Sequence, residues 1–275
     1  MDPEAAGPLA IINPVMNLKF IIAICALAVT GIASAQVTTT LTGRVRDFKM
    51  RNTQGGHPDF EWQVSGHKKG MVSQYTNNAG KPNFVAPNGY GGVTSKDTFN
   101  QWFNDTAGVN VGFDMPITLT RANNGVYTYS NQNFFAADNK GFGNQGYNRN
   151  YGFTYEVNST FGYEASKNHK FTFTGDDDVW VYINGKLAID LGGVHGALSQ
   201  TVDLNSIASS FNLVDGNNYN IQVFYAERHT TQSSFRIDTT IPLVNAPVNP
   251  VPEPATMAVL GMGALALFRR KRASK

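Results

Sequence analysis

The sequence of 275 residues contains a single cysteine, Cys25. This residue lies inside an apolar run near the N-terminus that we interpret below as a signal peptide, so the exported protein is expected to have no thiol. A chain without thiols forms no disulfide, no cysteine-based zinc site and no cysteine nucleophile. Its stability must therefore come from a packed core, with or without a bound metal ion.

Charged residues are scarce and long apolar helical stripes are missing. The chain is 15 % charged, 41 % hydrophobic and 12 % aromatic, a balance typical of a folded domain. Many Gly, Asn and Thr residues favour turns and an all-β fold. We predict a β-sandwich or flattened barrel of about ten strands. One short helix is expected over residues 95–109, where Phe99, Trp102 and Phe103 recur at helical spacing.

The mature chain also lacks a basic excess. Residues 36–250 contain 16 basic and 17 acidic side chains, so the excess of +2 in the whole chain belongs to its two ends. Binding to nucleic acid would require a basic face. We therefore expect no nucleic-acid partner.

The N-terminal 35 residues are typical of an export signal. From Met16, where translation is expected to start, Lys19 precedes an apolar run, and Ala33-Ser34-Ala35 forms a small-residue cleavage site before Gln36. We therefore divide the chain into an upstream extension plus signal peptide (1–35), a β domain (36–241), a proline-rich linker (242–250) and a C-terminal segment (251–275). This organisation predicts export through the Sec pathway.

The C-terminal segment has three parts. Pro252-Glu253-Pro254 precedes an apolar stretch over residues 255–268, and Arg269 and Arg270 begin a basic end. This pattern resembles the PEP-CTERM sorting signal of Gram-negative bacteria. The resemblance implies recognition and cleavage by an exosortase, a transient stay in the membrane, and delivery to the cell surface or exopolysaccharide. A plain membrane anchor or an amphipathic tail is the alternative.

The most informative internal stretch covers residues 171–196. Phe171 and Phe173 alternate with threonines, and Val179, Val181 and Ile183 alternate with Trp180 and Tyr182, which predicts β-strands with one side buried. Asn184-Gly185 predicts a tight hairpin, because a type I′ turn requires positive φ at both central residues.

Three consecutive carboxylates, Asp176, Asp177 and Asp178, lie between the first two of these strands. Like charges this close repel one another unless solvent or a cation neutralises them. A hard cation such as calcium is the natural candidate, and an acidic solvated turn is the alternative. Asp190 precedes a glycine loop and is a further candidate ligand, whereas Asp59 and Glu61 are either cation ligands or part of a capped turn.

Several separated blocks, in the same order, resemble the fibro-slime domain, whose core belongs with the protective-antigen-type β domains of flocculin adhesins. The blocks are GRVRDF (43–48), HPDFE (57–61), KDTFNQWFNDTAGVN (96–110), residues 171–196 and YNIQVFYAERHTTQSSFRIDT (219–239). In sugar-binding members of that group, two adjacent Asp residues joined by a cis peptide bind calcium, and the ion ligates sugar hydroxyls. The resemblance places this pair at Asp176 and Asp177; Asp178 departs from a position that is often Gly, and the disulfides of the lectins are absent.

These observations give three candidate functions. The first is an exported, calcium-dependent module that binds extracellular polysaccharide, with His195 and the aromatic rings of Tyr90, Tyr147 and Tyr151 as further candidate contacts. The second is a structural matrix protein whose metal ion only stiffens a loop. The third, a glycosidase, is disfavoured because adjacent carboxylates in one turn seldom flank a scissile bond at about 5–9 Å. We expect no enzymatic activity.

Overall fold

A computed structural model describes residues 36–246 of the chain. The predicted signal peptide and the C-terminal segment, including Pro252, Glu253, Pro254, Arg269 and Arg270, lie outside these residues. Within the described range, no helix combines the length and the hydropathy that crossing a bilayer would require.

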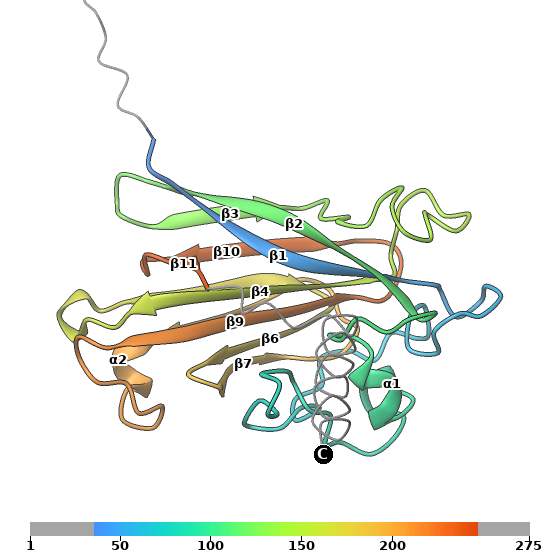
Figure 1. Ribbon diagram of the computed structural model, residues 1–275, viewed down its shortest axis with the longest axis horizontal. Coiled ribbons are helices and arrows are strands. Elements are labelled where there is room, and N and C mark those ends of the chain that lie inside the picture. Colours follow the sequence, from blue (N-terminus) through green and yellow to red (C-terminus); the bar gives the residue numbers. More distant parts are fainter. Residues whose placement is uncertain (1–35, 247–275) are drawn as a thin grey trace, which may run out of the picture. The chain divides into compact units, whose positions relative to one another are not determined.

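The described chain is almost entirely β, as predicted. Eleven strands form one antiparallel sheet in the order β7-β6-β9-β4-β1-β2-β3-β10-β5-β8, with β11 paired to β4 (Figure 1). The strands are β1 (Thr38–Phe48), β2 (Asn110–Arg121), β3 (Tyr127–Asn131), β4 (Phe153–Gly162), β5 (Lys170–Asp176), β6 (Asp178–Ile183), β7 (Lys186–Leu191), β8 (Leu198–Asp203), β9 (Asn218–Glu227), β10 (Ser234–Thr239) and β11 (Val244–Asn245). The helical elements are short: α1 (Lys96–Asn100), α2 (Leu204–Ile207) and the 3₁₀ turns η1 (Tyr90–Gly92) and η2 (Ala165–Lys167).

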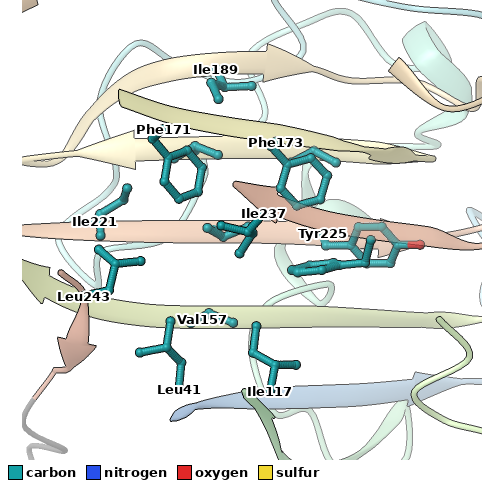
Figure 2. Close-up of a cluster of buried hydrophobic side chains, with 14 of the residues drawn as sticks. Leu41, Ile117, Val157, Phe171, Phe173, Ile189, Ile221, Tyr225, Ile237 and Leu243 are labelled. Carbon is teal, nitrogen blue, oxygen red and sulfur yellow. The ribbon is translucent and has the colours of Figure 1, made fainter. Parts of the chain in front are cut away.

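The sheet curls so that its two ends approach each other. The terminal strands β7 and β8 contact one another, and the result is a nearly closed, flattened barrel. Inside it, Phe171 and Phe173 of β5 and Ile237 of β10 face Ile221 and Tyr225 of β9 (Figure 2). The alternation of apolar residues in each strand supplies this core, because every second side chain points inward.

A second hydrophobic core lies on the outer face of β6 and β9. The prediction that β6 has only one buried side was wrong: Trp180 and Tyr182 are as completely buried as Val181. They contact Phe99, Phe103 and Phe224 within a cluster formed largely by the segment between β1 and β2. Period-two alternation cannot predict this coverage, because a distant part of the chain provides it.

The local predictions about turns and the helix had different outcomes. Asn184 and Gly185 both have positive φ and connect β6 to β7 in the predicted hairpin. The helix α1 is much shorter than residues 95–109; it begins at a reciprocal capping box between Ser95 and Thr98 and covers only five residues. Trp102 lies beyond its end in a series of turns, yet is fully buried.

Asp47 of β1 is a buried carboxylate that fixes the long connection between β3 and β4. The backbone N–H of Phe142 donates to its Oδ2, and Asn150 Nδ2 donates to its Oδ1 over 2.8 Å. Burial opposes ionisation more strongly than these donors favour it, and raises the pKa of Asp47 to about 7.

This shift predicts a pH-dependent stability. Between about pH 4 and 7 the folded protein keeps a proton on Asp47 that the unfolded chain releases, so the contribution of this group falls as pH rises, by up to about 1.4 kcal/mol per pH unit. We expect Asp47→Asn, which cannot titrate, to be more destabilising at pH 5 than at pH 8. Urea unfolding of both proteins across this range measures the difference, and a difference that stays constant with pH would contradict the assignment.

Candidate functional site

The three consecutive Asp residues do not form the tip of a hairpin. Strand β5 pairs with β8 and β10, whereas β6 pairs with β7 and β9, so Asp177 links two separate parts of the sheet. The peptide bond between Asp176 and Asp177 is cis, as the resemblance implies. All three side chains are buried, at 4 %, 6 % and 0 % exposure. The carboxylates are therefore buried where β5 passes into β6, and burial strengthens their mutual repulsion.

Asp178 is neutralised by Arg228. The guanidinium Nε lies 2.6 Å from Asp178 Oδ2, both side chains are at most 1 % exposed, and the backbone N–H of Gly193 donates to Oδ1. Arg228 also donates to the carbonyl oxygens of Asp59, Gly91 and Gly92. Both carboxylate oxygens of Asp178 thus already accept hydrogen bonds from the protein. Asp178 therefore stabilises the turn. Carboxylate oxygens that could bind a metal ion are expected on its neighbours Asp176 and Asp177.

Asp176 and Asp177 each accept one backbone donor, and their other carboxylate oxygens have no hydrogen-bond partner among residues 36–246. The N–H of Ser234 donates to Asp176 Oδ1, and the N–H of Arg228 donates to Asp177 Oδ2 over 3.0 Å. Burial raises the pKa of both carboxyl groups, and the nearby charges of Asp176 and Asp178 raise the pKa of Asp177 further. Negative charge is therefore only partly compensated at this pair.

Glu227 adds a fourth carboxylate, in a segment expected to form a salt-bridged strand edge and not among the predicted metal ligands. It is fully buried at the end of β9; Tyr225 Oη donates to its Oε2, whereas Oε1 has no partner among the described residues. Burial raises the pKa of Glu227 well above its usual value, and the charges of Asp177 and Asp176 add to this effect. The signal was present in the sequence, because Glu227 continues the inward phase of Ile221, Val223 and Tyr225.

The donor chemistry of this end of the barrel fits a hard cation. Four carboxylates are buried near one another, the fully buried guanidinium of Arg228 pairs with Asp178 alone, and calcium prefers such oxygen ligands. In the described part of the chain, however, no three His, Cys, Asp or Glu side chains form a complete metal site. Asp176 and Asp177 would therefore need further oxygens from backbone, hydroxyl or amide groups, water or a ligand.

Two adjoining hollows open beside the Asp pair. The smaller hollow has a volume of about 140 Å³ and is lined by Asp176 and Asp177, among others. The larger has a volume of about 370 Å³, and Asp176 lines it as well. Thr231 and Gln232, in the loop between β9 and β10, line both. Glu61 holds this loop, because Thr230 donates to its carboxylate from both N and Oγ1, over 3.0 and 3.1 Å.

His195 lines the smaller hollow, and Asp190 lines neither. Both ring nitrogens of His195 face carbonyl oxygens, with Nδ1 2.8 Å from Gly196 and Nε2 3.1 Å from Leu191. Asp190 instead accepts hydrogen bonds from Trp180 Nε1 and from the N–H of Gly70, over 3.1 and 2.8 Å. Asp190 thus joins β7 to the loop that covers it and is not brought to the Asp pair.

The three candidate tyrosines do not gather at the hollows. Tyr151 is only 4 % exposed, so the expectation that it presents a free ring was wrong. Its ring meets that of Tyr147 edge to face, and Asn52 donates to Tyr147 Oη over 2.7 Å. Tyr90 is 38 % exposed but lies on η1, where its hydroxyl donates to the carbonyl of Lys69. Asp59, the other candidate ligand, is buried and accepts hydrogen bonds from Thr94 and Trp102.

Two parts of the chain match models of known protein families. Residues 122–248 match the PA14 domain, and residues 250–272 match the PEP-CTERM protein-sorting motif. The Asp pair, Glu227 and Arg228 all lie inside the PA14 match, whereas β1 and β2 precede it.

Similar proteins include psiQ and psiB of Dictyostelium discoideum. The chain is 35 % identical to psiQ over 226 residues, which is 76 % of this chain and 22 % of psiQ. It is 41 % identical to psiB over 140 residues, 48 % of this chain and 24 % of psiB. The chain thus spans about a quarter or less of the length of these relatives.

Among solved structures, a PA14 sugar-binding domain from an RTX adhesin aligns with 73 % of this chain and 90 % of its own, at 10 % identity and a TM-score of 0.30. The two sequence matches agree with the expected protective-antigen-type core and sorting signal; the narrower fibro-slime resemblance stays a prediction. Residues 122–248 are therefore similar to the PA14 domain, and residues 250–272 to the PEP-CTERM protein-sorting motif.

Proposed function

We propose that this protein is an exported surface module that binds carbohydrate through calcium held at Asp176 and Asp177. The observation that carries the proposal is the undercompensated pair of carboxylates, which border a hollow inside the PA14 match. Its support includes the resemblance of this pair to the sugar-binding members of the protective-antigen group. We also propose that the β domain is related to the fibro-slime domain, which its sequence blocks resemble.

The protein residues around the pair have distinct roles in this proposal. When bound, the ion would supply a positive charge and open coordination positions for sugar hydroxyls. Asp176 and Asp177 would hold it through their free oxygens, while Arg228 neutralises Asp178 and fixes the backbone beside Asp177. Thr231 and Gln232 offer hydroxyl and amide groups at the border of both hollows.

The proposed location follows from the sorting motif. A PEP-CTERM motif after the β domain supports export, processing by an exosortase and a final position at the cell surface or in extracellular polysaccharide. Contact with the membrane would be transient. We propose binding without catalysis, because Asp176 and Asp177 are neighbours in one turn and glycosidases place two carboxylates on opposite sides of the scissile bond.

Calorimetric titration of calcium into the chelator-treated protein tests the proposal. Asp176→Asn and Asp177→Asn each retain an oxygen for the backbone donor but remove one negative charge. We expect each to weaken calcium binding at least about tenfold. Without calcium both variants should be as stable as the wild type or more so, since repulsion among the carboxylates decreases.

Asp97→Asn is the matched control, because it removes an exposed carboxylate in the first turn of α1 that lines neither hollow. It should bind calcium as the wild type does. If the wild type binds no calcium while folded, the metal-dependent proposal is wrong. If calcium binds and raises the melting temperature but no glycan is retained on an array, the structural matrix function takes its place.

A further inference from the structure

The two hollows beside the Asp pair share part of their lining and form one continuous surface. Asp176, Thr231 and Gln232 belong to both, so a ligand that reaches Asp176 borders the larger hollow as well. The smaller hollow, at about 140 Å³, is below the usual range for ligand sites of about 300–1,000 Å³, whereas the larger, at about 370 Å³, lies within it. The space for a ligand is therefore mainly on the side away from the turn.

The larger hollow is lined by groups suited to a sugar unit. Gln132, Asn133 and Gln232 are exposed amides, and within the described residues their side chains have no hydrogen-bond partner. An amide both donates and accepts, and can therefore pair with hydroxyl groups, which do the same. Phe135, half-buried at the same hollow, adds an apolar ring surface.

The charge of the larger hollow favours a neutral ligand. Asp176 is its single carboxylate and Arg236 its single guanidinium. Arg236 is already paired with Asp238, through Nε at 2.5 Å and Nη2 at 2.8 Å. An acidic sugar therefore finds no free guanidinium there, and a basic sugar finds no free carboxylate once Asp176 holds the proposed ion.

We propose that the site takes at least two successive units of a neutral polysaccharide, one at the Asp pair and the next in the larger hollow against Gln132 and Asn133. This inference rests on the proposed function and adds its ligand class. An oligosaccharide, rather than a single sugar, fills the continuous surface. The amides of Gln132 and Asn133 contribute to affinity only when the second unit is present.

Titration calorimetry with calcium present tests this inference. The probes are glucose, mannose and galactose, with di- and tetrasaccharides built from each. For the sugar that binds, we expect the tetrasaccharide to bind at least about tenfold more tightly than the monosaccharide, as two or more additional hydrogen bonds allow. The double variant Gln132→Ala/Asn133→Ala should lose most of this advantage and keep its affinity for the monosaccharide.

Gln74→Ala/Asn78→Ala is the matched control, since it removes an exposed Gln and Asn from a loop that lines neither hollow. It should behave as the wild type. Equal affinity for monosaccharide and tetrasaccharide, or equal losses in both double variants, would overturn the inference and leave the proposed function intact. Absence of binding to every saccharide would overturn both.

Discussion

Replacing Arg228 with methionine is expected to lower the free energy of unfolding by about 3–5 kcal/mol, the usual effect of breaking a buried ion pair. The substitution leaves the Asp178 carboxylate, which is fully buried, without its partner at 2.6 Å. It also removes the donors to three backbone carbonyls and the guanidinium that lies 4.6 Å from the Trp102 ring centroid. We expect calcium affinity to fall too, because Arg228 supports the acidic turn.

Urea unfolding and a double-mutant cycle with Asp178→Asn measure this effect. In the cycle, Asp178→Asn should remove much of the penalty of Arg228→Met, since no unpaired charge then remains. Arg228→Lys keeps the charge but not the planar fork, and should give an intermediate loss. Losses that simply add would show that Arg228 stabilises the fold mainly through its backbone and Trp102 contacts.

Replacing Glu156 with glutamine should have a similarly large effect, again about 3–5 kcal/mol. Glu156 of β4 accepts hydrogen bonds from Arg46 Nη1 at 3.0 Å, from Lys81 Nζ and from Asn158 Nδ2, and its side chain is 2 % exposed. Burial raises its pKa, but the charges of Lys81 and Arg46 outweigh burial and hold the pKa below its usual value. Lys81 belongs to the segment over the outer core, so this interaction anchors that segment to the sheet.

The loss should depend on pH with a defined sign. Because the folded pKa is lowered, the contribution of Glu156 is complete above the ordinary carboxyl pKa and is lost as pH falls through the folded value. In urea unfolding, wild type and Glu156→Gln should therefore differ most near pH 7, and the difference should shrink as pH falls below the ordinary carboxyl pKa. Asp114→Asn is the control, since its exposed pair with Arg44 should contribute at most about 1 kcal/mol; an equal loss in both variants would contradict the argument.

The sequence patterns succeeded where the cause of the structure is local. Asn184-Gly185 forms its hairpin because positive φ is a property of those two residues. Alternation along β5 and β6 identified inward residues such as Phe173 and Val181, because side chains in a strand alternate between faces. The same rule, applied along β9 from Ile221 to Glu227, indicates that Glu227 is buried.

Patterns failed where a contact joins distant parts of the chain. Trp180 and Tyr182 were expected at the surface and are buried, because the segment between β1 and β2 covers β6. The acidic turn was expected between two consecutive strands, but the sequence did not indicate that these strands pair with different partners. The predicted helix over residues 95–109 is longer than the observed α1 for the same reason. Trp102 packs into the outer core from a series of turns, so its burial does not require a helix.

By itself, the sequence determined the all-β class, the sorting motif and the three adjacent carboxylates, since strand periodicity, signal composition and residue identity are all local. Only the tertiary structure decided which carboxylates remain available. Arg228, fifty residues after Asp178, neutralises that residue, while Asp190 is held by Trp180 and Gly70. Charge compensation depends on distance in space, and folding brings these groups together across strands whose pairing no local pattern specifies.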